Sequence, residues 1–458
     1  KEKLIAEYVV KFASDHKLET IVDKTGNVII RKPATKGMEK RKGVILQAHL
    51  DMVPQKNSDK KHDFEKDPIE AIIDGEWVRA NGTTLGADNG IGVAAAMAIL
   101  ASKDIPHGPL EVLLTIDEET GMTGAFGLKK GLLHGDILMN LDSEDEGELY
   151  VGCAGGIDVA AIKKYSEVKT PAGMAAYQII AKGLKGGHSG VDIPLGRANS
   201  NKIMFRFLMQ AESDFKIRLA EAAGGDLRNA IPRESHAVVA VPKKSAAEFE
   251  KFVKNYEKMY RNEFSETEPA LSFKCKETVL PEKVMSKDDQ FGIIRAVFAC
   301  PNGVQRMSQA MKGLVETSNN VAIVKCRNGK FEAYNLTRSS VDSSKESTAW
   351  KIAAVFHLID AKVTLSGSYP GWKPNMESPI LKTMSGVYKK LYNRIPDIKA
   401  IHAGLECGLL GGVYPKLDMI SFGPTIRYPH SPDEKVHIES VGKFFDFLCA
   451  TLKVVPEK

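Results

Sequence analysis

His49 and Asp51 stand two residues apart at the end of the apolar segment VILQAHLDMVP. On a strand, residues i and i+2 point to the same face, so the two side chains would lie together. An imidazole that binds a metal usually gives its second nitrogen to a carboxylate or carbonyl group, which fixes the orientation of the ring. The pair is therefore compatible with a metal site. Taken alone, a strand end with two polar residues is the simpler explanation.

Four further segments place acidic residues or histidines directly after apolar runs or at the start of a helix. Each has an ordinary explanation when it is considered singly. Asp88 in GTTLGADNGIG suits a helix N-cap, and Glu118 and Glu119 in VLLTIDEETG suit a solvated surface. Asp142 ends the apolar run of ILMNLDSEDEG, and His430 in IRYPHSPDEKVH lies in a proline-bounded loop where a structural histidine would be unremarkable.

The five segments together are harder to explain as unrelated features. In open α/β sheets ligands bind beyond the carboxyl ends of the strands, which is where these residues fall. Two histidines with three or four carboxylates suit Zn²⁺ or Mn²⁺ and are too rich in nitrogen for Mg²⁺. Two-metal sites hold their ions about 3.5–4 Å apart, and a bridging carboxylate is the simplest way to do so. The sequence therefore predicts a candidate two-metal centre.

The elements that must position these residues alternate in type over the first 150 residues. Short apolar runs predict strands, and a stretch rich in small residues predicts a helix at 89–102. The predicted strands are 27–31, 44–48, 110–116 and 137–141. This β-α-β rhythm indicates a mixed or parallel sheet covered by helices.

The pattern changes between about residues 155 and 367, where two rounds of strands and helices follow one another. The first round has strands at 177–183 and 236–241 and helices at 198–212 and 246–264. The second has a strand at 271–275, helices at 289–299 and 346–359, and a hairpin whose turn is Arg327-Asn328-Gly329. We therefore expect residues 156–367 to form an inserted α/β domain of two lobes. Residues 1–155 and 368–458 would form the catalytic domain.

Composition excludes several classes of protein. The 63 basic and 58 acidic residues nearly cancel, and the lysines lack the aromatic interleaving of a nucleic-acid surface. No stretch approaches the roughly 18 apolar residues of a membrane helix. GADNGIG has neither the G-x-G-x-x-G pattern nor a P-loop lysine, which argues against nucleotide binding. The six cysteines show no paired metal spacing, so we expect reduced thiols in a cytoplasmic protein.

Eight motifs, in order along the chain, resemble those of the bacterial aminoacyl-histidine dipeptidases, which are Xaa-His or carnosinase-like enzymes of the dizinc peptidase clan. The motifs are HLDMV, GTTLGADNGIG, DEETGMTGA, LDSEDEGELYVGCAGG, KGGHSGVDI, NAIPRES, HAGLECG and YPHSPDE. The resemblance covers the whole chain, including the insertion. It implies an α/β fold, in which a mixed-sheet zinc-peptidase domain with helices on both faces carries an inserted two-lobed lid.

The resemblance also implies a role for each residue of the candidate metal site. Asp88 would bridge two Zn²⁺ ions, which Mn²⁺ or Co²⁺ could replace, and a cis peptide would follow it at Asp88-Asn89. Asp51 would orient His49, and Glu118 would be the general base on the attacking water. The other four ligands would form two pairs, one for each ion: His49 with Asp142, and Glu119 with His430.

Residues of the insertion would bind the substrate. His188 in KGGHSG would donate a hydrogen bond to the scissile carbonyl oxygen as it becomes an oxyanion. Asn229 and Arg338 match the positions that hold the substrate backbone and its C-terminal carboxylate, which the planar fork of arginine suits. Three other arginines near these motifs leave the choice of the carboxylate-binding residue open: Arg197, Arg228 and Arg233.

The resemblance further implies that Glu406 in HAGLECG lines the substrate cleft, whereas His402 would be structural. The expected activity is hydrolysis of dipeptides, Xaa-His among them, by a cytosolic homodimer whose lid closes over the cleft. The alternative is a deacylase of the same clan that acts on N-acyl amino acids with the same ions and a different lid. The long insertion favours the dipeptidase. A scaffold protein that had lost catalysis would lack the base Glu118, which is present.

Overall fold

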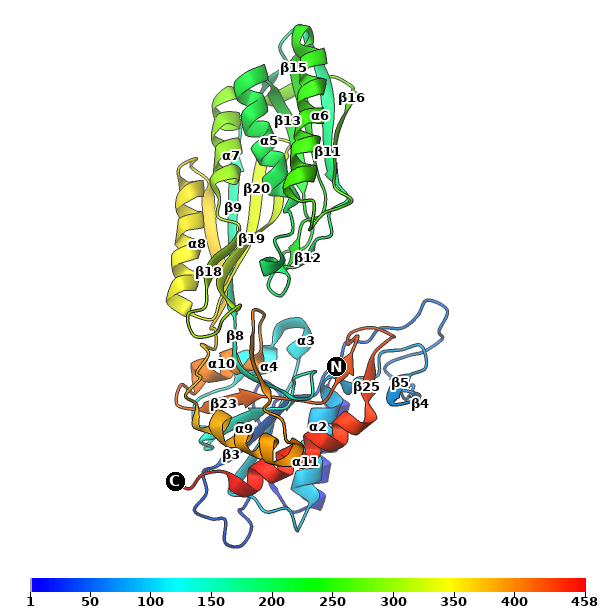
Figure 1. The fold of residues 1–458 in the computed structure, drawn as a ribbon, viewed down its shortest axis with the longest axis vertical. Coiled ribbons are helices and arrows are strands. Elements are labelled where there is room, and N and C mark those ends of the chain that lie inside the picture. Colours follow the sequence, from blue (N-terminus) through cyan, green and yellow to red (C-terminus); the bar gives the residue numbers. More distant parts are fainter. Residues whose placement is uncertain (1) are drawn as a thin grey trace. The chain divides into compact units, whose positions relative to one another are not determined.

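The computed structural model describes residues 2–458 and divides into two compact units. Unit 1 comprises residues 1–153, 372–400 and 405–458, and unit 2 comprises residues 154–371 and 401–404. Figure 1 follows the chain out of the first unit, through the second and back. Residues 401–404 belong with unit 2 because the carbonyl groups of Ile401 and Ala403 both accept a hydrogen bond from Ala154 N.

Unit 1 contains an eight-stranded mixed sheet in the order β1-β2-β6-β3-β7-β23-β8-β22. Its four central strands run parallel to one another, and every residue of the first three is buried. These strands are β6 (Leu110–Thr115), β3 (Val44–His49), β7 (Ile137–Asn140) and β23 (Asp418–Ser421). The outer strands are β1 (Glu19–Val22), β2 (Val28–Lys32), β8 (Glu148–Cys153) and β22 (Asp397–Ile401). Continuous burial explains why the central strands are mostly apolar in the sequence, with Gln47 and Glu111 as buried polar exceptions.

Helices pack against this sheet and place its loops. The long ones are α1 (Lys3–Asp15), α2 (Ala87–Ala101), α9 (Pro379–Tyr392) and α11 (Ile438–Val454), and the short ones are α3 (Glu118–Gly121), α4 (Thr123–Gly127) and α10 (Glu406–Val413). Helix α2 packs on β3, and both α9 and α10 pack on β23. A second sheet of unit 1 has the order β24-β25-β5-β4: Ile426–Arg427, Lys435–His437, Trp77–Ala80 and Ala71–Asp74.

Unit 2 is built on one continuous antiparallel sheet, so the two predicted lobes are two halves of a single sheet. One half has the order β16-β11-β15-β13: Ser272–Thr278, Met174–Lys182, Ser235–Pro242 and Arg218–Gly224. The other has the order β19-β20-β9-β21, with β18 beside β19: Val315–Arg327, Lys330–Ser339, Gly155–Lys164, Lys362–Tyr369 and Gly303–Met307. Strand β13 pairs with β19 and joins the halves.

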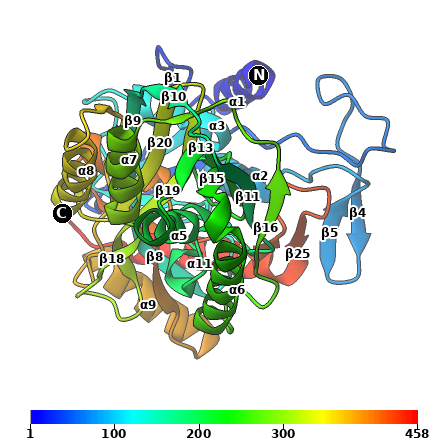
Figure 2. The ribbon, with the colours of Figure 1, turned by 90° about the horizontal axis from the view of Figure 1, so that it is seen from above.

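The remaining paired strands of unit 2 are short. They are β10 (Glu167–Lys169) with β17 (Lys283–Met285), and β12 (Gly187–His188) with β14 (Ala230–Ile231). The helices α5 (Ser200–Phe215), α6 (Ala246–Glu263), α7 (Lys287–Ala299) and α8 (Asp342–His357) pack on the large sheet, and Figure 2 shows them together along one face of it. Buried and half-buried residues alternate in β9 and β11, as expected for a sheet with one covered face.

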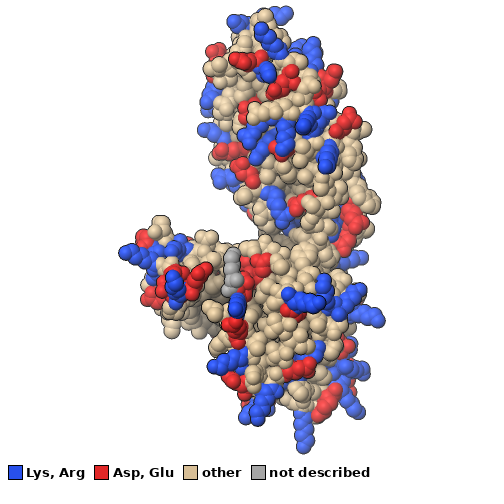
Figure 3. Space-filling view, turned by 180° about the vertical axis from the view of Figure 1, so that it is seen from behind, with Lys and Arg blue, Asp and Glu red and all other residues tan. Residues whose placement is uncertain are grey.

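The surface and the cysteines agree with the composition. Figure 3 shows basic and acidic side chains interspersed on the face that it presents. No helix among the described residues is long and apolar enough to cross a membrane. Cys275, Cys300, Cys326, Cys407 and Cys449 are free thiols.

Candidate metal centre

The candidate ligands of unit 1 meet at one edge of its sheet. His49 is the last residue of β3, Asp142 follows β7 by two residues, and Glu118 and Glu119 begin α3 directly after β6. Because these three strands are parallel and adjacent, their carboxyl ends lie side by side. The structure therefore brings together residues that are up to 93 positions apart in the chain.

Asp88 lies between the two histidines. Its Oδ1 atom is 3.2 Å from His49 Nε2, and its Oδ2 atom is 3.1 Å from His430 Nε2. Each histidine has a second carboxylate beside the same nitrogen: Asp142 Oδ1 is 3.2 Å from His49 Nε2, and Glu119 Oε2 is 2.9 Å from His430 Nε2. The five side chains thus form two groups that share one carboxylate.

The loop before α2 fixes the position of Asp88. The peptide bond Asp88-Asn89 is cis, as the sequence resemblance implied. The Asn89 side chain donates to Leu141 O at 2.7 Å and accepts from His49 N at 3.3 Å, which links the ends of β7 and β3. The buried carboxylate of Glu434 accepts hydrogen bonds from the backbone N–H groups of Leu85, Gly86 and Asp88. Sequence reasoning missed Asn89 and Glu434 as positioning residues.

Asp51 holds His49 from the side opposite Asp88. His49 Nδ1 lies 3.0 Å from the carbonyl oxygen of Asp51 and 3.4 Å from its Oδ1 atom. The same carboxylate accepts hydrogen bonds from Glu118 N at 3.0 Å and from Glu119 N at 3.1 Å. Asp51 therefore ties the imidazole to the first turn of α3, and it leaves His49 Nε2 facing the carboxylates.

These residues fit a pair of transition-metal ions. Zn–N and Zn–O bonds of about 2.0–2.2 Å would place neighbouring ligand atoms roughly 3.3 Å apart around a tetrahedral ion, close to the separations of 2.9–3.2 Å observed here. Among the described residues, no hydrogen-bond donor satisfies the buried atom Glu119 Oε1. Buried carboxylate oxygens without donors need cations nearby.

The charges of the site also indicate that it is suited to bind cations. Burial alone would lower the pKa of His49, but Asp142, Asp51 and Asp88 raise it well above its ordinary value. Hydrogen bonds to Asp88 and Glu119 raise the pKa of His430 to about 10. Asp88, which is half-buried, keeps a pKa below its ordinary range because both imidazoles hydrogen-bond to it.

Glu118 differs from its neighbour Glu119. Burial raises the pKa of the Glu118 carboxyl well above its ordinary value, and the negative charge of Asp142 raises it further. No described residue hydrogen-bonds to this carboxyl group, although its backbone N–H is held by Asp51. A carboxyl group with a raised pKa beside a metal centre is suited to accept and return a proton.

Glu406 lies inside unit 1 rather than on a solvent-accessible surface. Its side chain is fully buried at the start of α10, and its Oε2 atom accepts hydrogen bonds from Gln47 Nε2 at 2.6 Å and Thr115 Oγ1 at 2.7 Å. Burial raises its pKa to about 7. Through these hydrogen bonds Glu406 contacts the strands β3 and β6.

In unit 2, His188 and Arg338 lie together. Gly190 N and Val191 N donate to His188 Nδ1, and His188 Nε2 is 3.4 Å from Arg338 Nη2. Burial and the positive charge of Arg338 lower the pKa of His188, which keeps the ring neutral at neutral pH. Asn229 is exposed, and its carbonyl group accepts from Ser189 N.

Arg338 differs from the three other candidate arginines in its partners. It is 5% exposed, contacts Ser189 Oγ and Tyr369 Oη, and has no carboxylate partner among the described residues. By contrast, Arg197 pairs with Asp192, Arg228 pairs with Asp158, and Arg233 donates to Leu184 O. Arg338 thus carries a buried positive charge that no anion of residues 2–458 neutralises. His402, also in unit 2, is buried and bonded to Ser318 Oγ, and burial lowers its pKa to about 3.

Comparisons with known proteins bear on the whole chain. A family model described as "Peptidase family M20/M25/M40" matches residues 45–454. The cytosol non-specific dipeptidase of Escherichia coli (strain K12) is 48% identical over 457 residues, which cover all of this chain and 94% of that protein. The crystal structure of aminoacylhistidine dipeptidase from Vibrio alginolyticus superposes with a TM-score of 0.95 at 50% identity, covering 99% of this chain and 93% of that one. Aminopeptidase PepT from Bacillus cereus shares the fold, with a TM-score of 0.56 at 17% identity.

Proposed function

The chain belongs to peptidase family M20/M25/M40, and from this premise we propose that it is a cytosolic metallo-dipeptidase that hydrolyses Xaa-His and other dipeptides. The observation that carries the proposal is Asp88, whose two carboxylate oxygens face the Nε2 atoms of two different histidines. The E. coli and V. alginolyticus relatives, which this chain matches over its whole length, are named as dipeptidases.

We assign two Zn²⁺ ions to this centre, one with His49 and Asp142 and the other with Glu119 and His430, with Asp88 shared between them. Bound ions of this kind act as Lewis acids and lower the pKa of water toward 7. Glu118 accepts the proton of the attacking water and delivers it to the leaving amine. Asp51 keeps His49 in the orientation that exposes its Nε2 atom.

Residues carried by unit 2 would hold the remainder of the dipeptide. Neutral His188 would donate its Nε2 proton to the scissile carbonyl oxygen, where negative charge develops. Arg338 would bind the C-terminal carboxylate, since a buried guanidinium without an anion is stabilised by a ligand that brings one. The exposed side chain of Asn229 would contact the peptide backbone.

The proposal is tested with a substrate panel and the metals removed and restored. We expect the purified protein to contain about two zinc ions per chain and to hydrolyse Ala-His and Ala-Gly. Dialysis against a chelator should abolish turnover, and added Zn²⁺ or Mn²⁺ should restore it, because the carboxylates of the site cannot activate water without cations. Faster hydrolysis of N-acyl amino acids than of any dipeptide would instead identify a deacylase, and full turnover without metal would refute the proposal.

The role of Arg338 can be tested separately from the metal centre. We expect Arg338→Ala to lower kcat/KM for Ala-His by roughly 10²-fold, mainly through KM, because a charge-assisted contact to the carboxylate is lost. Arg338→Lys should recover only part of the lost kcat/KM, since lysine lacks the planar fork of arginine. Ala-His amide, which has no carboxylate, should be cleaved equally by wild type and variants.

The matched control for Arg338 is Arg228→Ala, which removes an arginine that is already paired with Asp158. It should leave kcat/KM for Ala-His within about threefold of wild type. Equal losses on Ala-His and on its amide would show that Arg338 acts on the structure of unit 2 and not on the carboxylate.

We also propose that the protein is a homodimer formed through unit 2. Strand β16 is an edge of the unit 2 sheet, and the residues that follow it include the apolar Val279 and Leu280, 88% and 42% exposed. Exposed apolar side chains beside a sheet edge are typical of an interface with another chain. A molar mass of about 100 kDa by light scattering would support the dimer, and 50 kDa would contradict it.

A further inference from the structure

Tyr369 and Arg338 meet over a glycine on one face of the unit 2 sheet. Gly156 of β9 is the register partner of Arg338 on β20 and also of Tyr369 on β21, so the three residues form a row across adjacent strands. Residues directly opposite each other in antiparallel strands point to the same face. Because Gly156 has no side chain, the two larger side chains can approach each other above it, and Arg338 Nη1 donates to Tyr369 Oη at 3.2 Å.

The backbone around Tyr369 fixes the ring in this position. The pairing of β21 with β9 shifts register between Ser366 and Tyr369, where Gly367 has a φ of +58°. A local irregularity of this kind re-aims the side chain that follows it. The buried Lys345 Nζ donates to the carbonyl oxygen of Tyr369. A Cβ atom at Gly156 would lie 2.7–2.8 Å from Cε1, Cζ and Oη of Tyr369, so the ring rests directly on this glycine.

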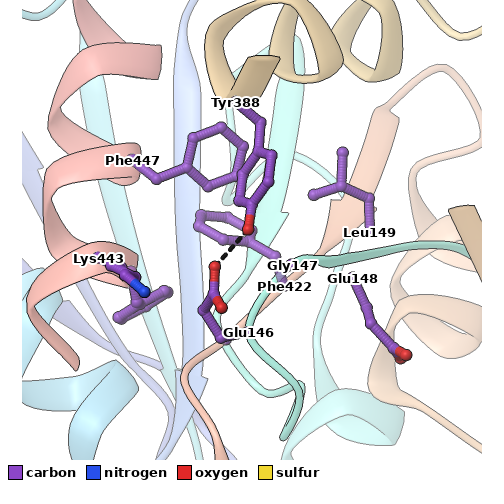
Figure 4. Close-up of a pocket in the computed structure, with 10 residues that line it drawn as sticks. Glu146, Gly147, Glu148, Leu149, Tyr388, Phe422, Lys443 and Phe447 are labelled. Atoms are coloured by element: carbon purple, nitrogen blue, oxygen red, sulfur yellow. Dashed lines mark hydrogen bonds between the residues drawn. The ribbon is translucent and has the colours of Figure 1, made fainter. Parts of the chain in front are cut away.

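The half-buried hydroxyl group of Tyr369 accepts a hydrogen bond from Arg338 but donates none to any described residue. A phenol can accept and donate at the same time. Tyr334 on β20 uses its proton within the fold and donates to Glu332 at 3.0 Å. In unit 1 the hydroxyl group of Tyr388 likewise donates to a carboxylate, as Figure 4 shows. Tyr369 therefore has a donor that the fold leaves free.

The free proton of Tyr369 lies beside a guanidinium group that also lacks an anion. No described carboxylate pairs with the buried Arg338. A carboxylate has two oxygens with about four lone-pair sites, so it can accept hydrogen bonds from two neighbouring donors at once. The guanidinium group and the phenol, 3.2 Å apart, are together suited to one carboxylate.

We propose that the Tyr369 hydroxyl group donates a hydrogen bond to the C-terminal carboxylate of the substrate, alongside Arg338. This inference rests on the proposed function and deepens it, because it adds a second group to the recognition of the substrate's C-terminus. A hydrogen bond to a charged acceptor contributes more than one between neutral groups. Gly156 takes part indirectly, since it leaves the space that the ring of Tyr369 occupies.

The test compares Ala-His with Ala-His amide in wild type, Tyr369→Phe and the control Tyr334→Phe. Tyr369→Phe keeps the ring and removes only the hydroxyl group, so KM for Ala-His should rise by about 10-fold. The values of kcat for Ala-His and of KM for the amide should stay within about threefold of wild type, because a ground-state contact to the carboxylate is all that is lost. Tyr334→Phe removes a hydroxyl group that is bonded to Glu332 and should change neither substrate by more than about threefold.

Two further variants test the contact itself. Gly156→Ala should raise KM for Ala-His at least as much as Tyr369→Phe and spare the amide, because the new methyl group displaces the ring. Adding Tyr369→Phe to Arg338→Ala should raise KM for Ala-His again, by at least about threefold, because the phenol binds the carboxylate directly. All four proteins should keep two zinc ions per chain, since no candidate metal ligand lies in unit 2.

Three outcomes would overturn the inference. An equal rise of KM for Ala-His and its amide in Tyr369→Phe would make the hydroxyl group a structural one. An unchanged KM for both substrates would show that it makes no contact with the substrate. No further rise in the Arg338→Ala background would make Tyr369 a positioning residue that acts only through Arg338. The proposed function fails separately, if wild-type protein does not hydrolyse Ala-His at all.

Discussion

Glu118→Gln is expected to lower kcat for Ala-His by about 10²–10⁴-fold while the protein keeps both zinc ions. A general base contributes a factor of this size, which corresponds to about 2.7–5.4 kcal/mol of barrier height. The substitution removes the group that accepts the water's proton and changes the shape of the side chain little. The Glu118 carboxyl makes no hydrogen bond to any described residue, so its replacement breaks no side-chain contact of the fold.

The matched control for Glu118 is its neighbour. Glu119→Gln alters an identical side chain one position along α3, but Glu119 Oε2 lies 2.9 Å from His430 Nε2 in the candidate metal centre. We therefore expect Glu119→Gln to lose zinc together with activity, measured by elemental analysis of the purified variant. If Glu118→Gln also lost zinc, the carboxyl group would be a ligand and not the base.

The candidate ligands could be found from the sequence because they sit where local patterns change. His49 and Asp142 lie at the ends of apolar runs. Such runs indicate buried central strands, and the fold fixes where these strands end. The eight motifs then identified the family, which the comparisons confirm. A two-residue spacing such as His49-x-Asp51 does not identify a metal site by itself, because many strand ends have two polar residues at this spacing.

The contacts between distant segments could not be predicted from the sequence. Glu434 holds the loop of Asp88 across almost 350 residues, and nothing near Glu434 in the sequence indicates that its carboxylate is buried. The choice among four arginines likewise depends on which of them is buried without an anion in three dimensions. Strands β8 and β9 were not predicted, because the glycines in ELYVGCAGG interrupt the apolar pattern that marks a strand.

Asp88→Ala is expected to abolish detectable turnover and to remove zinc from both positions. Asp88 is the one residue whose carboxylate oxygens face both histidines, so its loss affects both ions, whereas loss of any other ligand removes a contact to one. Asp51→Ala serves as the comparison because it leaves every ligand in place. Removal of an orienting partner of this kind typically costs 10–100-fold in metal affinity or activity.

Thermal unfolding separates a lost ligand from a lost fold in Asp88→Ala. Zinc at 100 times its dissociation constant should stabilise the wild-type protein by about 2.7 kcal/mol for each ion that binds only the folded state. Asp88→Ala should unfold near the temperature of the metal-free wild type and should show no stabilisation when zinc is added. Asp51→Ala should still be stabilised, but at higher zinc concentrations. A variant at Asp88 that bound two ions with wild-type affinity would rule out a bridging carboxylate, because the ions would then be held without the only group that both of them share.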